Sequence, residues 1–308
     1  MPGLDLIDAP TLRRLLPVGE AVEALRTALR AGLDVTGTPP RSRVPLSAGQ
    51  LLMMPAEFGQ YAGVKIAGVV PGNPARGLPT ITGSYLLLEA ATLSPLAVLD
   101  GEALTLLRTS AVSALAADHL ATPDAARLVL FGTGPQSYAH AVALAEVRAL
   151  RSVAVVGRDP ARVQALVTRC RDAGLPAAPG TVESVPGADL IACCTSSPEP
   201  LFDGRELAPH ATVVAMGSHT PEEREVDSAT AARSTVVVED PATALREAGD
   251  IVIPLRQGEL DTAELVPLAD LVSGHHTVDP SRPRLFKGTG MAWQDLVIAT
   301  AAHAASTR

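Results

Sequence analysis

The chain has 308 residues, 47% of them hydrophobic, and a formal net charge of −8 at pH 7. This length suffices for two domains with ordinary cores, and the acidic balance disfavours nucleic acid or an anionic membrane as a partner. No apolar run reaches the ~18 residues of a membrane span, and the start MPGLDLIDAP lacks the basic segment of a secretory signal. We therefore expect a cytoplasmic protein.

The predicted elements change character along the chain. Pro17–Ala31 has apolar residues at helical spacing. Between about residues 40 and 100, short apolar runs separated by Gly, Pro and Asn predict strands of a mixed or antiparallel sheet, and a long helix follows over 103–120. From residue 125, apolar strands alternate with helices, which predicts a parallel sheet covered on both faces. An alanine-rich helix is predicted over 290–306.

These patterns predict an α/β protein with two domains. Residues 123–289 are expected to form a Rossmann-type domain with a doubly wound parallel sheet. Residues 1–122 form an α+β domain, and we group 290–308 with it because the last helix is expected to pack back on the N-terminal half.

Cysteine and lysine are both scarce. Cys170, Cys193 and Cys194 have no metal-binding spacing, so we expect no metal site and no disulfide. The chain has 25 Lys and Arg residues together, of which only Lys65 and Lys287 are lysine. Two lysines in so arginine-rich a chain are either there by chance or have a specific role.

A glycine-rich turn follows the predicted strand LVLF. It reads Gly132-Thr133-Gly134-Pro135-Gln136-Ser137, a G-x-G-x-x-S pattern that opens a predicted helix. Gly132 permits the tight turn, Gly134 lets a pyrophosphate approach the backbone, and Ser137 is small enough for close packing. We predict a dinucleotide site that includes Pro135 and Gln136, the alternative being a glycine turn in a structural domain.

The end of the next strand distinguishes NAD from NADP. An NAD site usually has an acidic residue there to bind the ribose 2′-hydroxyl, but this chain has Gly157-Arg158-Asp159. The guanidinium of Arg158 can pair with a 2′-phosphate or stack on adenine. We therefore expect NADP(H) rather than NAD(H), with all three residues at the cofactor, although Asp159 could instead cap the helix that Pro160 begins.

A histidine lies in the segment VVAMGSHTPEERE. A short buried strand is predicted to end at Met216, which we include among the cofactor contacts, and Thr220, Pro221 and Glu223 have the pattern of a helix start. His219 falls between them, where α/β proteins place catalytic groups. It could supply a proton, with its charged form opposed by the predicted helix, or it could serve only as a structural or steric group.

The whole chain resembles the ornithine cyclodeaminase/mu-crystallin family. The matching segments are RSRVPL (41–46), MPAEF (54–58), GVKIAGVVPGNPARGLPT (63–80), LAVLDGEALTLLRTSAVSA (96–114), FGTGPQS (131–137), GSHTPEEREVD (217–227) and LFKGTGMAWQDL (285–296). The resemblance implies a substrate-binding and dimerisation domain joined to the Rossmann domain, and so a homodimer. Family members use NAD(P)(H) to interconvert amino and imino acids or to cyclise ornithine, and a few only bind ligands.

The resemblance also implies roles for particular residues. Arg41, Lys65 and Arg108 match the clamp for the substrate carboxylate, whereas Lys287 matches a motif without a chemical role. Arg43 is the rival to Arg41, because both lie on one face if the segment is extended, and an ion-paired or solvated arginine is the alternative for Arg41 and Arg108. Three threonines are matched to the cofactor: Thr80, Thr109 and Thr195.

Two departures from the family pattern concern the reaction. Ornithine-cyclising members have an aspartate where this chain has His219, and a glutamate that binds the side-chain amine where it has Leu52. Without both carboxylates a second amine would not be recognised, and an apolar Leu52 favours a substrate with a hydrocarbon end.

We therefore expect an NADPH-dependent reductase of small cyclic 2-imino acids, of the pyrroline-2-carboxylate or piperideine-2-carboxylate type, or the reverse dehydrogenation. The alternatives are an ornithine or lysine cyclodeaminase with catalytic NAD, and a non-catalytic NADPH-dependent binding protein.

Overall fold

The computed structural model describes residues 4–307 and divides into two compact units. Unit 1 comprises Met1–Arg108 and Met291–Arg308, and unit 2 comprises Thr109–Gly290. The division falls within a helix, α3 (Gly101–Leu120), rather than after it. The first three residues of the start MPGLDLIDAP lie outside the described residues. Within residues 4–307, no helix has both the length and the apolar character needed to cross a membrane.

Unit 1 is built on one six-stranded sheet with the order β1-β6-β5-β4-β3-β2. Only β1 and β6 pair in parallel, and the other neighbours form antiparallel pairs, which confirms the predicted mixed sheet. The strands are β1 (Asp5–Ile7), β2 (Ser42–Leu46), β3 (Gly49–Phe58), β4 (Tyr61–Val69), β5 (Ile81–Glu89) and β6 (Pro95–Asp100).

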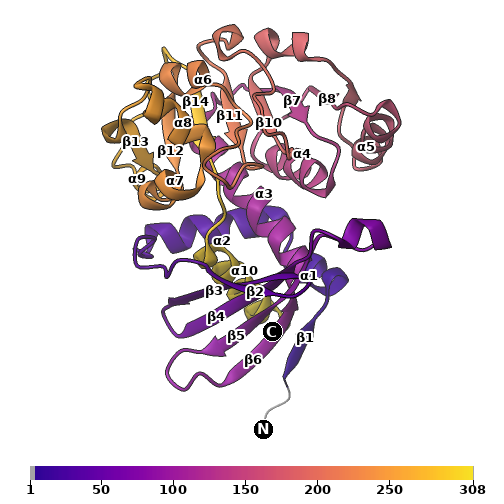
Figure 1. Ribbon diagram of the computed structural model, residues 1–308, viewed down its shortest axis with the longest axis vertical. Coiled ribbons are helices and arrows are strands. Elements are labelled where there is room, and N and C mark those ends of the chain that lie inside the picture. Colours follow the sequence, from indigo (N-terminus) through magenta and orange to yellow (C-terminus); the bar gives the residue numbers. More distant parts are fainter. Residues whose placement is uncertain (1–3, 308) are drawn as a thin grey trace. The chain divides into compact units, whose positions relative to one another are not determined.

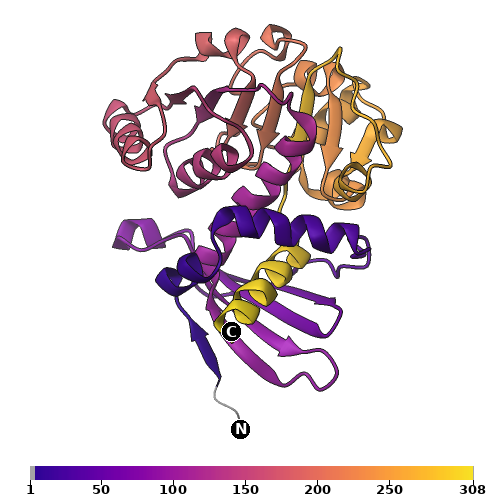
Figure 2. The same cartoon turned by 180° about the vertical axis from the view of Figure 1, so that it is seen from behind.

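The helices of unit 1 cover one face of this sheet. α10 (Ala292–Ser306) lies across β3, β4 and β5 and against α2 (Val18–Arg30), as Figure 2 shows for the yellow helix. Its alanines allow close packing, and its first turns are almost completely buried. A short helix, α1 (Ala9–Leu15), was not predicted, and Asp8 caps it. A 3₁₀ turn at Asn73–Arg76 lies between β4 and β5.

Unit 2 contains an eight-stranded parallel sheet with the order β13-β12-β14-β11-β10-β7-β8-β9 (Figure 1). The strand order reverses between β7 and β10, where doubly wound sheets bind ligands. The strands are β7 (Arg127–Phe131), β8 (Ser152–Val156), β9 (Ala177–Pro179), β10 (Leu190–Cys193), β11 (Thr212–Ala215), β12 (Thr235–Val238), β13 (Leu265–Pro267) and β14 (Arg284–Lys287). The predicted Rossmann-type α/β fold is confirmed.

The helices of unit 2 follow the strands as expected for such a sheet. They are α4 (Pro135–Val147), α5 (Pro160–Asp172), α6 (Ser228–Arg233), α7 (Pro241–Glu247), α8 (Gly249–Gln257) and α9 (Leu268–Val272), with 3₁₀ turns at Val182–Gly187, Gly204–Glu206 and Thr262–Glu264. Buried apolar side chains lie on both faces of the sheet, and Cys170, Cys193 and Cys194 are buried free thiols in this unit.

The helix predicted to begin at Thr220 is absent. Residues 216–227 form turns and bends, and the next helix, α6, begins at Ser228 with Asp227 as its cap. The backbone groups that a helix would use are taken by other partners: Thr220 O accepts from Gly249 N, and Glu223 O accepts from Ser218 Oγ. No helix therefore follows His219 directly, and the expected opposition of a helix dipole to its charge does not apply.

One fully buried histidine ties helix α4 to helix α3 within unit 2. The Nδ1 atom of His140 lies 2.8 Å from Gln136 O, and its Nε2 lies 3.0 Å from Ser113 Oγ. Because a carbonyl oxygen only accepts, Nδ1 carries the proton and Nε2 accepts from the Ser113 hydroxyl. Burial lowers the pKa of His140 to about 4.

We expect this histidine to make the protein less stable in acid. Its folded-state pKa lies below the unfolded value, so its stabilisation is complete above pH ~6.5 and is lost as the pH falls through 4, by up to about 3 kcal/mol. Urea unfolding at several pH values measures the effect. His140→Asn should be less stable at pH 7 but lose less on acidification, and equal pH slopes in the two proteins would contradict the assignment.

Candidate functional site

A lysine inside unit 1 faces the C-terminal helix. In the register of the sheet, Lys65 on β4 lies opposite Met54 on β3 and Tyr85 on β5. These three side chains therefore share the face of the sheet that α10 covers. Only 5% of Lys65 is exposed. A buried ammonium group needs an anionic or hydrogen-bonding partner to remain charged, and the start of α10 provides one.

That partner is Asp295, in the first turn of α10. Its Oδ2 lies 2.8 Å from Lys65 Nζ, and its Oδ1 lies 3.5 Å from Arg108 Nε. Arg108 also donates to Gln294 Oε1 at 2.9 Å, and Lys65 donates to Thr105 Oγ1 at 3.4 Å. A carboxylate near a helix N-terminus is further stabilised by the helix dipole. Asp295 thus holds both cations in fixed positions.

The cluster around Lys65 carries more positive than negative charge. Burial lowers the pKa of Lys65 to about 8, although the charge of Asp295 opposes the shift. The positive charges of Arg108 and Arg41 act in the same direction as burial. Two cations, Lys65 and Arg108, therefore share one carboxylate, and a second carboxylate, supplied by a ligand, would stabilise the ammonium form of Lys65.

The strand register distinguishes Arg41 from its rival Arg43. Arg41 precedes β2 and extends the row of Met54 and Lys65, whereas Arg43 pairs with Leu52 and is exposed. Arg41 is half-buried and close enough to influence the pKa of Lys65. Leu52 lies one row further along the same face and is partly buried, so it offers an apolar surface beside the cations.

The two threonines matched to the cofactor in this part of the chain differ in exposure. Thr80 lies in an exposed bend before β5, where its carbonyl accepts from Val70 N. Thr109 is buried in α3 and follows Arg108 directly.

In unit 2, the glycine-rich turn has the geometry that a dinucleotide requires. Gly132 has a φ of +109°, and a Cβ there would lie 2.4 Å from Cys194 O, so the turn itself requires glycine. Gly134 is the N-cap of α4, and a Cβ there would meet nothing within 4 Å. The protein's own packing therefore leaves this position open, as the approach of a pyrophosphate to the helix N-terminus needs. Pro135 and Gln136 begin α4, and Gln136 Oε1 is a buried acceptor without a partner among residues 4–307.

A side chain at the end of β8 would crowd two neighbouring side chains. A Cβ at Gly157 would lie 2.7 Å from Thr133 Cγ2 and 2.9 Å from Val163 Cγ2. Asp159 caps α5 by accepting from Ala161 N at 2.9 Å, which was the alternative considered for it. Arg158 is exposed beside them.

The ends of β10 and β11 are joined by one buried carboxylate. Glu225 accepts hydrogen bonds from Thr195 N, Thr195 Oγ1 and Gly217 N at 2.6–2.7 Å. Met216, half-buried, donates from its N to Cys193 O. Thr195 and Met216, both matched to the cofactor, therefore lie at neighbouring strand ends.

His219 is exposed in a loop that is held at both of its ends. Lys287 Nζ donates to Ser218 O at 2.8 Å and pairs with Asp250 Oδ2 at 2.9 Å. Asp250 Oδ1 accepts from the backbone N of Glu225 and of Val226. The second lysine of the chain thus has a structural role, one that sequence reasoning left unassigned.

The groups that sequence reasoning missed are the buried carboxylates of Glu225 and Asp250, whereas Asp295 was matched to a family position with a possible structural role. Glu225 and Asp295 stand in segments that matched the family, but nothing in their local pattern indicates which donors they collect. Asp250 carried no signal of its own. Across residues 4–307, no cluster of three or more His, Cys, Asp or Glu side chains could hold a metal ion.

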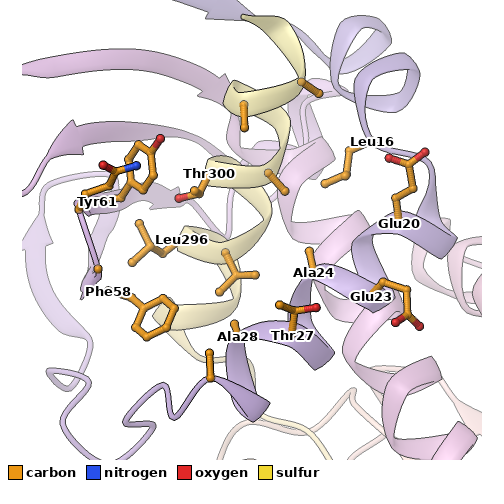
Figure 3. A pocket seen from close by; sticks show the side chains of 17 residues that line it. Leu16, Glu20, Glu23, Ala24, Thr27, Ala28, Phe58, Tyr61, Leu296 and Thr300 are labelled. Atoms are coloured by element: carbon orange, nitrogen blue, oxygen red, sulfur yellow. The ribbon is translucent and has the colours of Figure 1, made fainter. Parts of the chain in front are cut away.

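A separate cavity in unit 1 has a different character. It has a volume of about 590 Å³ and lies between α2, α10 and the turn from β3 to β4. Figure 3 shows Leu296, Phe58 and Ala28 lining it, with the carboxylates of Glu20 and Glu23 nearby. Its lining contains no basic side chain, so it does not suit an acidic ligand.

Known proteins similar to this chain share both units. The ornithine cyclodeaminase/mu-crystallin family matches residues 10–306. A Δ1-pyrroline-2-carboxylate reductase of Bacillus cereus is 33% identical over 96% of this chain and 94% of its own length. A Δ1-pyrroline-2-carboxylate/Δ1-piperideine-2-carboxylate reductase of Azospirillum brasilense is 36% identical over 84% of this chain and 82% of its own.

A solved structure extends the similarity to the fold. The Δ1-pyrroline-2-carboxylate reductase of Thermococcus litoralis, in complex with NADH and L-proline, has a TM-score of 0.90 and 27% identity, and the match covers 99% of this chain and 98% of that one. The similarity extends over nearly the full length of the chain, and the segments with the glycine turn and the cationic cluster lie within it. The chain belongs to the ornithine cyclodeaminase/mu-crystallin family.

Proposed function

We propose that the protein is a nicotinamide-dependent oxidoreductase that reduces the C=N bond of small cyclic 2-imino acids, of the pyrroline-2-carboxylate or piperideine-2-carboxylate type, to L-amino acids. The observation that carries the proposal is the positive charge around Lys65, where two buried cations, Lys65 and Arg108, share the single carboxylate of Asp295. The relatives that are named reductases of these imino acids support it.

Arg41, Lys65 and Arg108 bind the substrate carboxylate in this proposal. A 2-imino acid carries its carboxylate on the carbon that is reduced, so holding the carboxylate also positions the reacting carbon. Lys65 retains N–H capacity beyond its contacts with Asp295 and Thr105. Leu52 provides an apolar surface for the hydrocarbon part of the ring. A carboxylate at this position would instead bind an amine and favour a diamino acid.

Reduction also requires a proton on the ring nitrogen. His219 lies in a loop with fixed ends and is exposed, so it can supply this proton directly or through water. No covalent bond to the protein is needed. The carbon gains a hydride, the nitrogen gains a proton, and the C=N double bond becomes a single bond.

The residues of unit 2 fit a nicotinamide dinucleotide. Gly132, Gly134, Pro135 and Gln136 would hold the pyrophosphate at the N-terminus of α4, and Thr195 and Met216 would lie toward the nicotinamide. The bound cofactor would supply the hydride. We infer a preference for NADPH, supported by the crowding at Gly157, the capping role of Asp159 and the free approach to Arg158.

We further propose a cytoplasmic homodimer. On the sheet face opposite α10, Val44, Leu46 and Ile66 are 38%, 54% and 41% exposed. An apolar sheet face of this kind is usually covered, and a second copy is the simplest partner.

The mass in solution tests the dimer. We expect light scattering to give a dimer for the wild type and a monomer for Ile66→Glu, since a buried charge would disrupt the interface. Val182→Glu, at an apolar residue of unit 2 that is 42% exposed, is the control and should remain dimeric. A monomeric wild type would contradict the proposal.

Imine reduction is tested in a cuvette at neutral pH. We expect rapid loss of NADPH absorbance with Δ1-pyrroline-2-carboxylate, slower loss with NADH, and no ammonia from L-ornithine with NAD⁺. Arg158→Ala should reduce the advantage of NADPH because it removes the cation available to the 2′-phosphate. Ammonia and proline formed without net cofactor change would mean cyclodeamination, and cofactor binding without turnover would mean a binding protein.

Two arginines offer a matched test of the carboxylate clamp. We expect Arg41→Met to lower kcat/KM for the imino acid by on the order of 10- to 100-fold, because it removes a charged hydrogen-bond donor. Arg43→Met, two positions away and exposed, should change it less than about 3-fold. The measurement is steady-state kinetics at saturating NADPH, and equal effects of the two substitutions would refute the assignment.

A further inference from the structure

The loops after β10 and β11 in unit 2 are held together by Glu225. Its Oε1 accepts from Thr195 N and Thr195 Oγ1, each at 2.7 Å, and its Oε2 accepts from Gly217 N at 2.6 Å. A Cβ at Gly217 would lie 1.9 Å from Thr195 O, so only glycine permits this approach. The two strand ends therefore behave as one rigid group centred on a buried carboxylate.

These contacts determine how the hydroxyl of Thr195 can interact with a ligand. A hydroxyl has one proton and two acceptor lone pairs. The proton of Thr195 Oγ1 is donated to Glu225, and one lone pair accepts from Ser197 N at 3.1 Å. Thr195 is only half-buried, so one lone pair remains for a ligand, and it can only accept.

Charged and backbone groups around Glu225 favour this arrangement. Burial raises the pKa of Glu225, while the charge of Lys287 and the hydrogen bonds from Thr195 and Gly217 oppose the rise. Backbone N–H groups contact both carboxylate oxygens, and they can only donate. The carboxylate accepts from all three donors, so the Thr195 hydroxyl donates its hydrogen bond to Glu225.

Thr195 lies where the nicotinamide half of a dinucleotide is expected. The pyrophosphate turn follows β7, the adenosine side is toward β8 and Arg158, and β10 is the neighbour of β7 on the opposite side. The nicotinamide ring carries one N–H donor group, the NH₂ of its carboxamide. An acceptor at Thr195 complements that group.

We propose that Glu225 is a positioning residue that sets the hydrogen-bonding polarity of Thr195, so that the Thr195 hydroxyl recognises the carboxamide NH₂ of the nicotinamide as an acceptor. This inference rests on the proposed function, since it requires a nicotinamide cofactor. It assigns to Glu225 a specificity role that acts entirely through another side chain.

Calorimetric binding of NADP⁺ and of its 3-acetylpyridine analogue tests the proposal without measuring catalysis. The analogue has a methyl ketone in place of the carboxamide and so lacks the N–H donor. We expect the wild type to prefer NADP⁺ on the order of 10-fold, as the loss of one hydrogen bond implies. Glu225→Gln should bring the ratio close to one, because an amide places an N–H near Thr195 or Gly217 and no longer orients the hydroxyl.

Three further variants separate polarity from general loss of stability. Thr195→Val should also give a ratio close to one, and Thr195→Ser, which keeps the hydroxyl, should restore the preference. Glu239→Gln is the matched control: Glu239 is 2% exposed and accepts from Thr289 N, Thr289 Oγ1 and Gly290 N. It has the same set of donors at another loop, so its substitution should leave the ratio unchanged.

The outcomes separate this inference from the proposed function. A wild type that binds no dinucleotide overturns the proposed function and this inference with it. If the wild type binds NADP⁺ and Thr195→Val shows the same preference for NADP⁺ over the analogue as the wild type, the inference alone is overturned. An equal loss of preference in Glu239→Gln would also overturn the inference, because the loss would then follow from removing any buried carboxylate and not from the contact between Glu225 and Thr195.

Discussion

The ion pairs of Asp295 organise unit 1. A lysine as deeply buried as Lys65 would otherwise lose its proton or destabilise the fold. The partner carboxylate comes from the first turn of α10, so the last helix of the chain must pack on a sheet formed by the first hundred residues. This explains why unit 1 is discontinuous in sequence. The same carboxylate is shared by a second buried cation, Arg108, and the positive charge of this pair of cations is what the proposed function assigns to an acid substrate.

Unit 2 uses buried carboxylates for a related purpose. Glu225, Glu239 and Asp250 each accept several N–H or O–H groups at the ends of parallel strands. Asp189 does the same at the opposite edge, where it accepts from Ala126 N and Arg127 N. Loops at a sheet edge have backbone groups without ladder partners, and a fully paired carboxylate fixes them in one arrangement. For the loops that carry Thr195 and His219, a fixed arrangement also determines which chemical groups a ligand meets.

The sequence was most informative where the signal is local. Alternation of strands and helices after residue 125 predicted the parallel sheet, and the turn from Gly132 to Ser137 predicted the opening of α4. The helix pattern at Thr220, Pro221 and Glu223 was equally local but misleading, because α8 and Asp250 bind the backbone groups that a helix would have used. The strand β14 was not assigned from sequence, although it lies between β11 and β12 in the middle of the sheet.

By itself the sequence determined the α/β class, the glycine turn, the absence of an acidic residue at Gly157 and the identity of the cationic side chains. These properties depend on residue type and on spacing over a few positions. Only the tertiary structure decided that Arg41 rather than Arg43 lies near Lys65, that Asp295 is the counter-ion, and that Lys287 and Glu225 fix the loops around His219. Each of these contacts joins residues far apart in the chain. Which distant groups meet depends on strand register and on helix packing, and a local pattern cannot encode the partner of a buried charge.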